Sequence, residues 1–123
     1  MTEQAALLVD GDTIRAAQAQ MIAQIAAQHG ALRYSRAYLD LNRSSDWQGM
    51  GGFRLVPSGS GKNAADILLA LEAAELLCAK GIQRFVIATS DGVFRHRALR
   101  LREAGALVFG IGESKAPKPC ATA

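Results

Sequence analysis

The sequence has few cysteines, few aromatic residues and no long apolar run, and each shortage excludes a class of protein. Its two cysteines show no metal-ligand spacing and no framework of pairs, so we interpret both as free thiols rather than as a zinc site or a disulfide scaffold. No apolar stretch approaches the roughly 20 residues that cross a bilayer, and the first residues lack the basic segment of a secretion signal. We therefore expect a cytoplasmic protein without membrane contact.

The composition that remains is that of one domain with an aliphatic core. Of the 123 residues, 50% are hydrophobic and only 6% are aromatic, which suits a core of the α/β type. The formal net charge of +3 permits nucleic-acid binding without requiring it. We expect the domain to span residues 1–112, followed by a flexible tail of small and polar residues over 113–123.

Alternating apolar runs and helix signals predict the order strand, helix, strand, strand, helix, strand, helix, strand. The expected strands are residues 7–9, 32–39, 53–56, 85–88 and 106–111. Expected helices run from a cap at Asp12 or Thr13 to Gly30, from a cap at Asn63 to about 79, and from about 92 to 103. This order predicts an α/β fold, a three-layer α/β/α sandwich around a mostly parallel central sheet.

Three aspartates are placed where expected strands end or a helix begins: Asp10, Asp66 and Asp91. The carboxyl ends of parallel strands open onto one crevice, so acids there can converge despite their distance in sequence. Carboxylates suit Mg²⁺ or Mn²⁺, which can activate a water for attack on a phosphodiester. The alternative for Asp12, Asp66 and Asp91 is helix capping, which does not account for Asp10 at the end of its strand.

Basic residues follow the last of these acids. Arg95, Arg97, Arg100 and Arg102 lie within eight residues and would form one basic helix face beside the acidic site. Such a face suits RNA phosphates, and its alternative is an ordinary solvated helix surface.

Two other motifs match only in part. The segment 58–63 hints at a phosphate loop, but Val56 stands at the first glycine position and Asn63 at the Ser/Thr position that would hold Mg²⁺. Residues 10–13 are similar to the nucleophile motif of haloacid-dehalogenase-like phosphatases, although the threonine comes one residue early. We keep that phosphatase as a less favoured alternative.

The whole pattern resembles the NYN domain, in the LabA-like branch of the PIN-like ribonuclease superfamily, over roughly residues 6–112. The matching segments are residues 8–12, 36–38, 62–67, 86–94 and 102–112. The resemblance implies a metal-dependent ribonuclease that uses Mg²⁺ or Mn²⁺ to hydrolyse RNA. It implies catalytic metal ligands at Asp10, Asp66 and Asp91, an outer contact from Asp12, and a phosphate contact from Lys62.

Two residues depart from the family pattern and keep an alternative open. Thr13 stands where members commonly have asparagine, and Val93 stands where members commonly have a further acid. Because an aliphatic side chain cannot ligate metal, the alternative is a catalytically weak or inactive RNA-binding NYN domain. RNA is the expected partner in both cases, and we leave a homodimer open.

Overall fold

A computed structural model describes residues 3–42, 46–61, 63–90, 92 and 94–112. Their strands are β1 (Gln4–Asp10), β2 (Ala31–Leu39), β3 (Arg54–Pro57), β4 (Arg84–Ala88) and β5 (Leu107–Ile111). Their helices are the short 3₁₀ helix η1 (Ala16–Gln18), α1 (Ala19–Ala27), α2 (Ala64–Lys80) and α3 (Phe94–Glu103). The expected strands are all present, and their ends differ from the expected ones by at most three residues.

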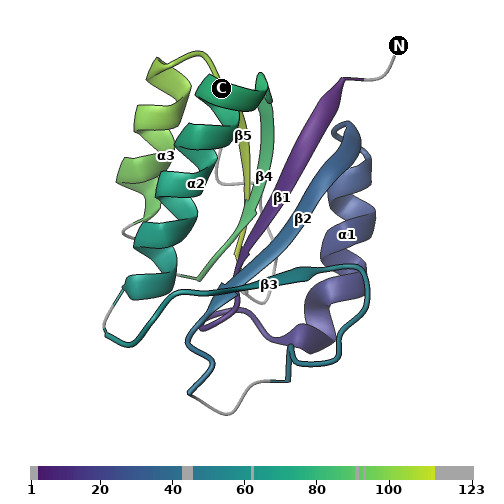
Figure 1. Cartoon of the computed structure of the whole chain (residues 1–123). Helices are drawn as coiled ribbons and strands as arrows, with labels where there is room; N and C mark the ends of the chain where they lie inside the picture. The colour runs from purple at the N-terminus through teal and green to yellow at the C-terminus, as the bar shows by residue number, and fades with distance from the viewer. Residues whose placement is uncertain (1–2, 43–45, 62, 91, 93, 113–123) are drawn as a thin grey trace.

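The five strands form one sheet in the order β3-β2-β1-β4-β5, and every neighbouring pair is parallel. Helices α2 and α3 cover one face and α1 covers the other (Figure 1). This confirms the expected α/β/α sandwich, and the sheet is wholly parallel rather than mostly so. No helix in the described ranges is long and apolar enough to span a membrane.

Strand β1 lies at the centre and is buried on both faces, as a strand between two helical layers must be. Ala6 and Leu8 pack with α2 and α3, while Leu7 and Val9 pack toward α1. The loop after β2 adds Trp47 to the α1 side, where it is fully buried and its Nε1 donates to the Ile14 carbonyl at 2.8 Å. The loop is therefore part of the core.

The expected cap of the first helix is wrong. Neither Asp12 nor Thr13 caps a helix, because η1 begins only at Ala16 and α1 at Ala19. The chain after β1 instead makes a turn in which the Asp10 carbonyl accepts the N–H groups of Thr13 and Ile14 at 3.2 and 2.9 Å. This turn leaves the side chains of residues 12 and 13 available for contacts across the edge of the sheet.

The second helix begins where the sequence predicts, but without the expected side-chain bond. Asn63 occupies the cap position with a left-handed φ of 65° and makes no side-chain capping hydrogen bond. Its carbonyl accepts the Ile67 N–H at 2.9 Å, the first bond of the helix. Gly81 ends α2 at φ 70°, a conformation that glycine adopts without the penalty of a Cβ.

Candidate active site

Asp10 ends β1 at the carboxyl edge of the sheet and is only 2% exposed. Its Oδ1 accepts the Asp12 N–H at 3.1 Å, and its Oδ2 accepts the Thr89 hydroxyl at 3.1 Å. The next residue, Gly11, donates its N–H to the Tyr38 carbonyl at 2.7 Å, and a Cβ there would come within 3.2 Å of that oxygen. Close packing with β2 thus fixes the backbone that carries the carboxylate.

Burial dominates the electrostatics of Asp10. Desolvation raises the pKa of its carboxyl above the usual range, and the negative charge of Asp12 acts in the same direction. The hydrogen bonds from Thr89, the Asp12 N–H and Thr13 lower that pKa without cancelling the effect of burial. Since both oxygens accept from neutral donors, a cation nearby would favour the ionised form that the site otherwise disfavours.

A hydroxyl network joins the end of β1 to the end of β4. The Thr13 hydroxyl lies 3.4 Å from the Thr89 hydroxyl and accepts the Ser90 N–H at 3.0 Å. The two threonine hydroxyls therefore connect the end of β1 to the end of β4, and both hydrogen-bond to Asp10. Sequence reasoning missed Thr89, although its position directly after the clearest buried strand was a usable signal.

Asp12 turns toward the end of β2. Its Oδ1 accepts the Asp40 N–H at 3.2 Å, and Asp40 itself is buried at 8% exposure, with its Oδ1 accepting the Asn42 N–H at 2.9 Å. Sequence reasoning also missed Asp40, which follows β2 as Asp10 follows β1. The rule that selected Asp10 would have selected it too.

Asp66 lies in the first turn of α2, as predicted, and is 1% exposed. Its Oδ2 forms an ion pair with Arg97 of α3 at 2.6 Å, and the Arg97 side chain is 30% exposed. The sequence suggested Arg97 as an RNA contact, whereas the structure places it against one of the predicted catalytic acids. Arg97 offsets the charge of a carboxylate that burial alone would make costly.

The other predicted basic residues divide into two groups. Arg95 and Arg100 are exposed on α3, while Arg102 is partly buried and donates to the Val108 carbonyl at 3.2 Å. Lys62, Asp91 and Val93 lie outside the described residues, so the predicted acid triad is described only at Asp10 and Asp66. Two of the four arginines are thus engaged within the domain.

The oxygen atoms at the carboxyl edge of the sheet are of the kind that binds a hard divalent cation. Carboxylate and hydroxyl oxygens surround Asp10, and such oxygens are the ligands that Mg²⁺ and Mn²⁺ prefer. Within the described ranges, no group of three His, Cys, Asp or Glu side chains is arranged to hold a metal ion. Any complete site would therefore need a residue beyond them or bound water.

A parallel α/β/α sandwich with buried acids at its carboxyl edge is the architecture expected of a PIN-like domain. The NYN domain model matches residues 4–123, and the chain belongs to the NYN domain family. The LabA-like branch remains a prediction. Comparison with curated proteins finds no match.

A solved structure shares the fold. It is a protein of unknown function from Vibrio parahaemolyticus, 22% identical to this chain, with a TM-score of 0.65. The similarity covers 90% of this chain and 82% of that one. It supports the architecture and leaves the chemistry to be argued from the residues themselves.

Proposed function

We propose that the protein is a metal-dependent ribonuclease that hydrolyses RNA phosphodiester bonds at the carboxyl edge of the sheet. The observation that carries this proposal is the placement of Asp10, a nearly fully buried carboxylate held by neutral donors at the end of the central strand. A buried carboxylate of this kind costs stability unless a cation or another partner compensates its charge. Membership of a family within a nuclease superfamily supports the same conclusion.

The proposed roles follow the sequence analysis. Asp10, Asp66 and Asp91 are the proposed catalytic residues and ligands of Mg²⁺ or Mn²⁺, with Asp12 as an outer contact. When bound, the cation would activate a water and offset charge on the phosphate. Lys62 and the arginines of α3 are proposed to contact RNA phosphates, chiefly through the exposed Arg95 and Arg100.

The chain's own residues prepare this site before RNA arrives. Thr89 and the Asp12 N–H hold the two oxygens of Asp10 in one orientation, so little ordering is left for the moment of binding. Arg97 keeps the Asp66 carboxylate in place through a short charged hydrogen bond. The buried surroundings of both acids limit access of bulk water.

One observation favours the alternative of an RNA-binding domain with weak or no turnover. The Oδ2 of Asp66 is already engaged by Arg97 at 2.6 Å, so a cation at that oxygen must compete with a guanidinium. If Asp66 stays bound to Arg97 when metal is present, the ion pair is structural and the site loses one of its proposed metal ligands.

The direct test is cleavage of a labelled single-stranded RNA by purified protein with Mg²⁺, with Mn²⁺ and with chelator. We expect turnover with at least one metal and none with chelator. An Asp10→Asn variant is the control for contaminating nuclease. RNA binding with a normal salt dependence but no turnover with either metal would select the RNA-binding alternative.

A further inference from the structure

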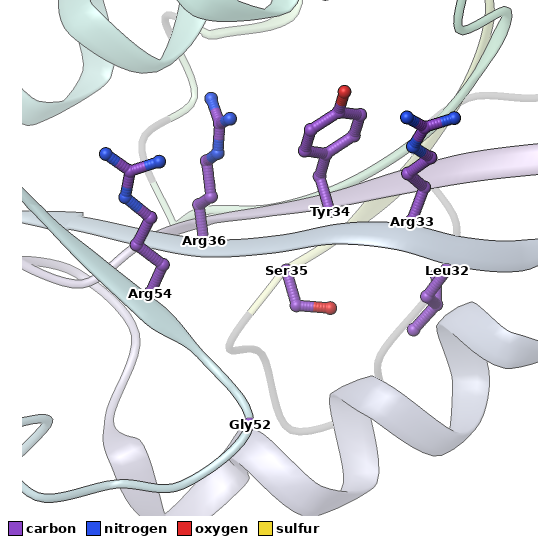
Figure 2. Close-up of a pocket in the computed structure, with 7 residues that line it drawn as sticks. All are labelled: Leu32, Arg33, Tyr34, Ser35, Arg36, Gly52 and Arg54. Atoms are coloured by element: carbon purple, nitrogen blue, oxygen red, sulfur yellow. The ribbon is translucent and has the colours of Figure 1, made fainter.

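A second surface lies along the edge of β2, away from the acids. Strand β3 pairs with β2 only from Arg36 to Leu39, so in the described part of the chain the first half of β2 has no strand neighbour on that side. A hollow of about 470 Å³ runs along this edge (Figure 2). Its lining residues are Leu32, Arg33, Tyr34, Ser35, Arg36, Gly52 and Arg54. All charged side chains among them are arginines.

A β-bulge gathers these side chains on one face. Ala5 of β1 pairs with Leu32 and Ala6 pairs with Tyr34, so Arg33 is an extra residue on β2. Regular alternation would send Arg33 and Tyr34 to opposite faces, and the bulge removes that constraint. Figure 2 shows both rising from the same side of β2 as Arg36, while Leu32 and Ser35 point the other way.

The tyrosine ring orders the neighbouring guanidinium groups. The Cζ atom of Arg36 lies 4.9 Å from the centroid of the Tyr34 ring, and that of Arg33 lies 5.7 Å from it. Arg36 also donates to Glu72 at 2.7 Å, which fixes its position. Arg54 is the register partner of Arg36 and projects from the same face in Figure 2. We call Arg33, Tyr34, Arg36 and Arg54 the β2 edge surface.

The β2 edge surface carries unbalanced positive charge. Arg33 and Arg54 are exposed, and neither forms an ion pair with a carboxylate of the described residues. Arg33 contacts only a neutral partner among the hydrogen bonds found there, the Gln4 Oε1 at 3.4 Å. Each guanidinium presents five N–H donors in a fork that matches phosphate oxygens. The complementary ligand is therefore an anion with spaced oxyanion groups, a description that the phosphates of a nucleic-acid strand meet.

The same features argue against an added peptide strand. Charged side chains and bulges are the usual means by which sheet edges resist pairing with another strand. A phosphate backbone needs no ladder of main-chain hydrogen bonds. The same arginines that hinder pairing with a peptide strand would attract the phosphates. Charge complementarity thus favours a nucleic-acid strand over a peptide or a second copy of this sheet.

We propose that the β2 edge surface binds the backbone of single-stranded RNA and positions it toward the carboxyl edge of the sheet. This proposal takes from the proposed function only that the bound nucleic acid is RNA. Strand β2 itself leads from Tyr34 to Asp40 beside the candidate active site, a span of about 20 Å at the usual rise per residue. The four residues are positioning residues, remote from the reacting atoms.

Binding is measured in chelator, where no cleavage interferes, by fluorescence anisotropy of a labelled 12-nucleotide oligouridylate across a range of KCl concentrations. We expect Arg33→Ala/Arg54→Ala to weaken binding about tenfold or more and to reduce the salt slope by about 1.4, because two phosphate contacts are lost. Tyr34→Leu should weaken binding about threefold at an unchanged slope, because it removes the ring that contacts the two guanidinium groups and removes no charge. Lys80→Ala, which removes one exposed charge from the end of α2, is the control and should do little.

The outcomes separate the two proposals. A folded Arg33→Ala/Arg54→Ala variant that binds the oligonucleotide as tightly as wild type overturns the β2 edge surface. Arginine-dependent binding of an acidic 12-residue peptide, with no binding of RNA, also overturns it and assigns the surface to a protein partner. With Mn²⁺ present, the double variant should raise KM and leave kcat unchanged. Absence of turnover in wild type would refute the nuclease proposal. The binding measurements in chelator would still test the β2 edge surface.

Discussion

Asp10 and Asp66 are equally buried yet differ in what surrounds them. Asp10 is 2% exposed and accepts hydrogen bonds from a backbone N–H and a hydroxyl, while Asp66 is 1% exposed and pairs with the guanidinium of Arg97. One acid therefore carries its charge without a positive partner among its hydrogen-bond donors, and the other has one supplied by a neighbouring helix.

The difference shows which acid depends more on an external cation. Burial raises the pKa of Asp10, and its neutral donors offset that effect only in part. Asp66 already has internal compensation, so a metal ion adds less there than at Asp10. We infer that Asp10 is the main anchor of the proposed metal site and that Asp66 is subordinate to it. Four predictions test this comparison.

The largest expected effect is that of Asp10→Asn on RNA turnover. Removing the charge of the anchor should lower the rate by about two orders of magnitude, which corresponds to roughly 3 kcal/mol of transition-state stabilisation. Asparagine keeps one oxygen for the Asp12 N–H and can donate to the Thr89 hydroxyl, so the fold should persist. Single-turnover cleavage kinetics at saturating Mn²⁺, with circular dichroism as the check on folding, measure the effect.

The matched comparison is Asp12→Asn. Asp12 is a proposed outer contact, and its oxygen accepts the Asp40 N–H, a bond that asparagine can keep. We expect a loss of about tenfold or less, near 1.4 kcal/mol. Equal losses for the two variants would remove the distinction between anchor and outer contact.

The second prediction concerns stability and breaks the ion pair from each side. Arg97→Ala leaves a carboxylate of 1% exposure without its guanidinium and should cost about 3 kcal/mol of unfolding free energy. Asp66→Asn should cost less, about 1 kcal/mol, because the Arg97 side chain is 30% exposed and can turn to water. Urea unfolding at pH 7 measures both. A greater loss of unfolding free energy for Asp66→Asn than for Arg97→Ala would show that the unpaired Arg97 guanidinium is costlier to the fold than the unpaired Asp66 carboxylate.

The sequence predicted the sheet and the position of Asp10 because both depend on short-range signals. A buried run such as residues 85–88 is apolar whatever lies beside it, and an acid directly after such a run must reach the carboxyl edge of a parallel sheet. The helix start expected at Asn63 placed Asp66 in the first turn of α2. These inferences need only the chain's local pattern and the rule that crossovers in parallel sheets return the strands to one edge.

The partners of these acids were not predictable in the same way. Asp66 and Arg97 are 31 residues apart in the sequence, and their pairing depends on how α2 and α3 pack. The bulge at Arg33 is a property of register between β1 and β2, and no local propensity marks it. The cap at Asp12 or Thr13 was wrong because their side chains bond to the ends of β2 and β4, contacts that outweigh capping once the sheet forms.

The third prediction sharpens the comparison through pH. Because the pKa of Asp10 is raised in the folded state, its neutral form is favoured there, and stability from this group is lost as pH rises through that raised pKa. Asparagine mimics the neutral form. In chelator, Asp10→Asn should therefore gain stability relative to wild type as pH rises from about 4 to 7. Parallel urea unfolding curves at several pH values measure this, and a difference that does not change with pH would contradict it.

Adding Mn²⁺ at pH 7 should reverse that order. A ligand that binds only the folded state stabilises it by about 2.7 kcal/mol at a hundredfold excess over Kd. Wild type should gain this stabilisation and Asp10→Asn should gain little. Asp66→Asn should keep more of the Mn²⁺ effect than Asp10→Asn does, since Asp66 has Arg97 as an alternative partner.

The smallest expected effect is that of Thr89→Val, which alters the surroundings of Asp10 and leaves the acid in place. Valine has nearly the shape of threonine, so the variant keeps the packing and removes the hydroxyl that donates to the Asp10 Oδ2 at 3.1 Å and lies 3.4 Å from the Thr13 hydroxyl. A lost hydrogen bond of this kind is worth about 1 kcal/mol, and the rate should fall severalfold rather than a hundredfold. The pKa of Asp10 should rise further, because the Thr89 hydrogen bond lowers it. Thr89→Ser keeps the hydroxyl and should retain most of the activity. A Thr89→Val variant as active as wild type, with an unchanged pH–rate profile, would mean that Asp10 is oriented by its backbone, the Asp12 N–H and Thr13 without Thr89.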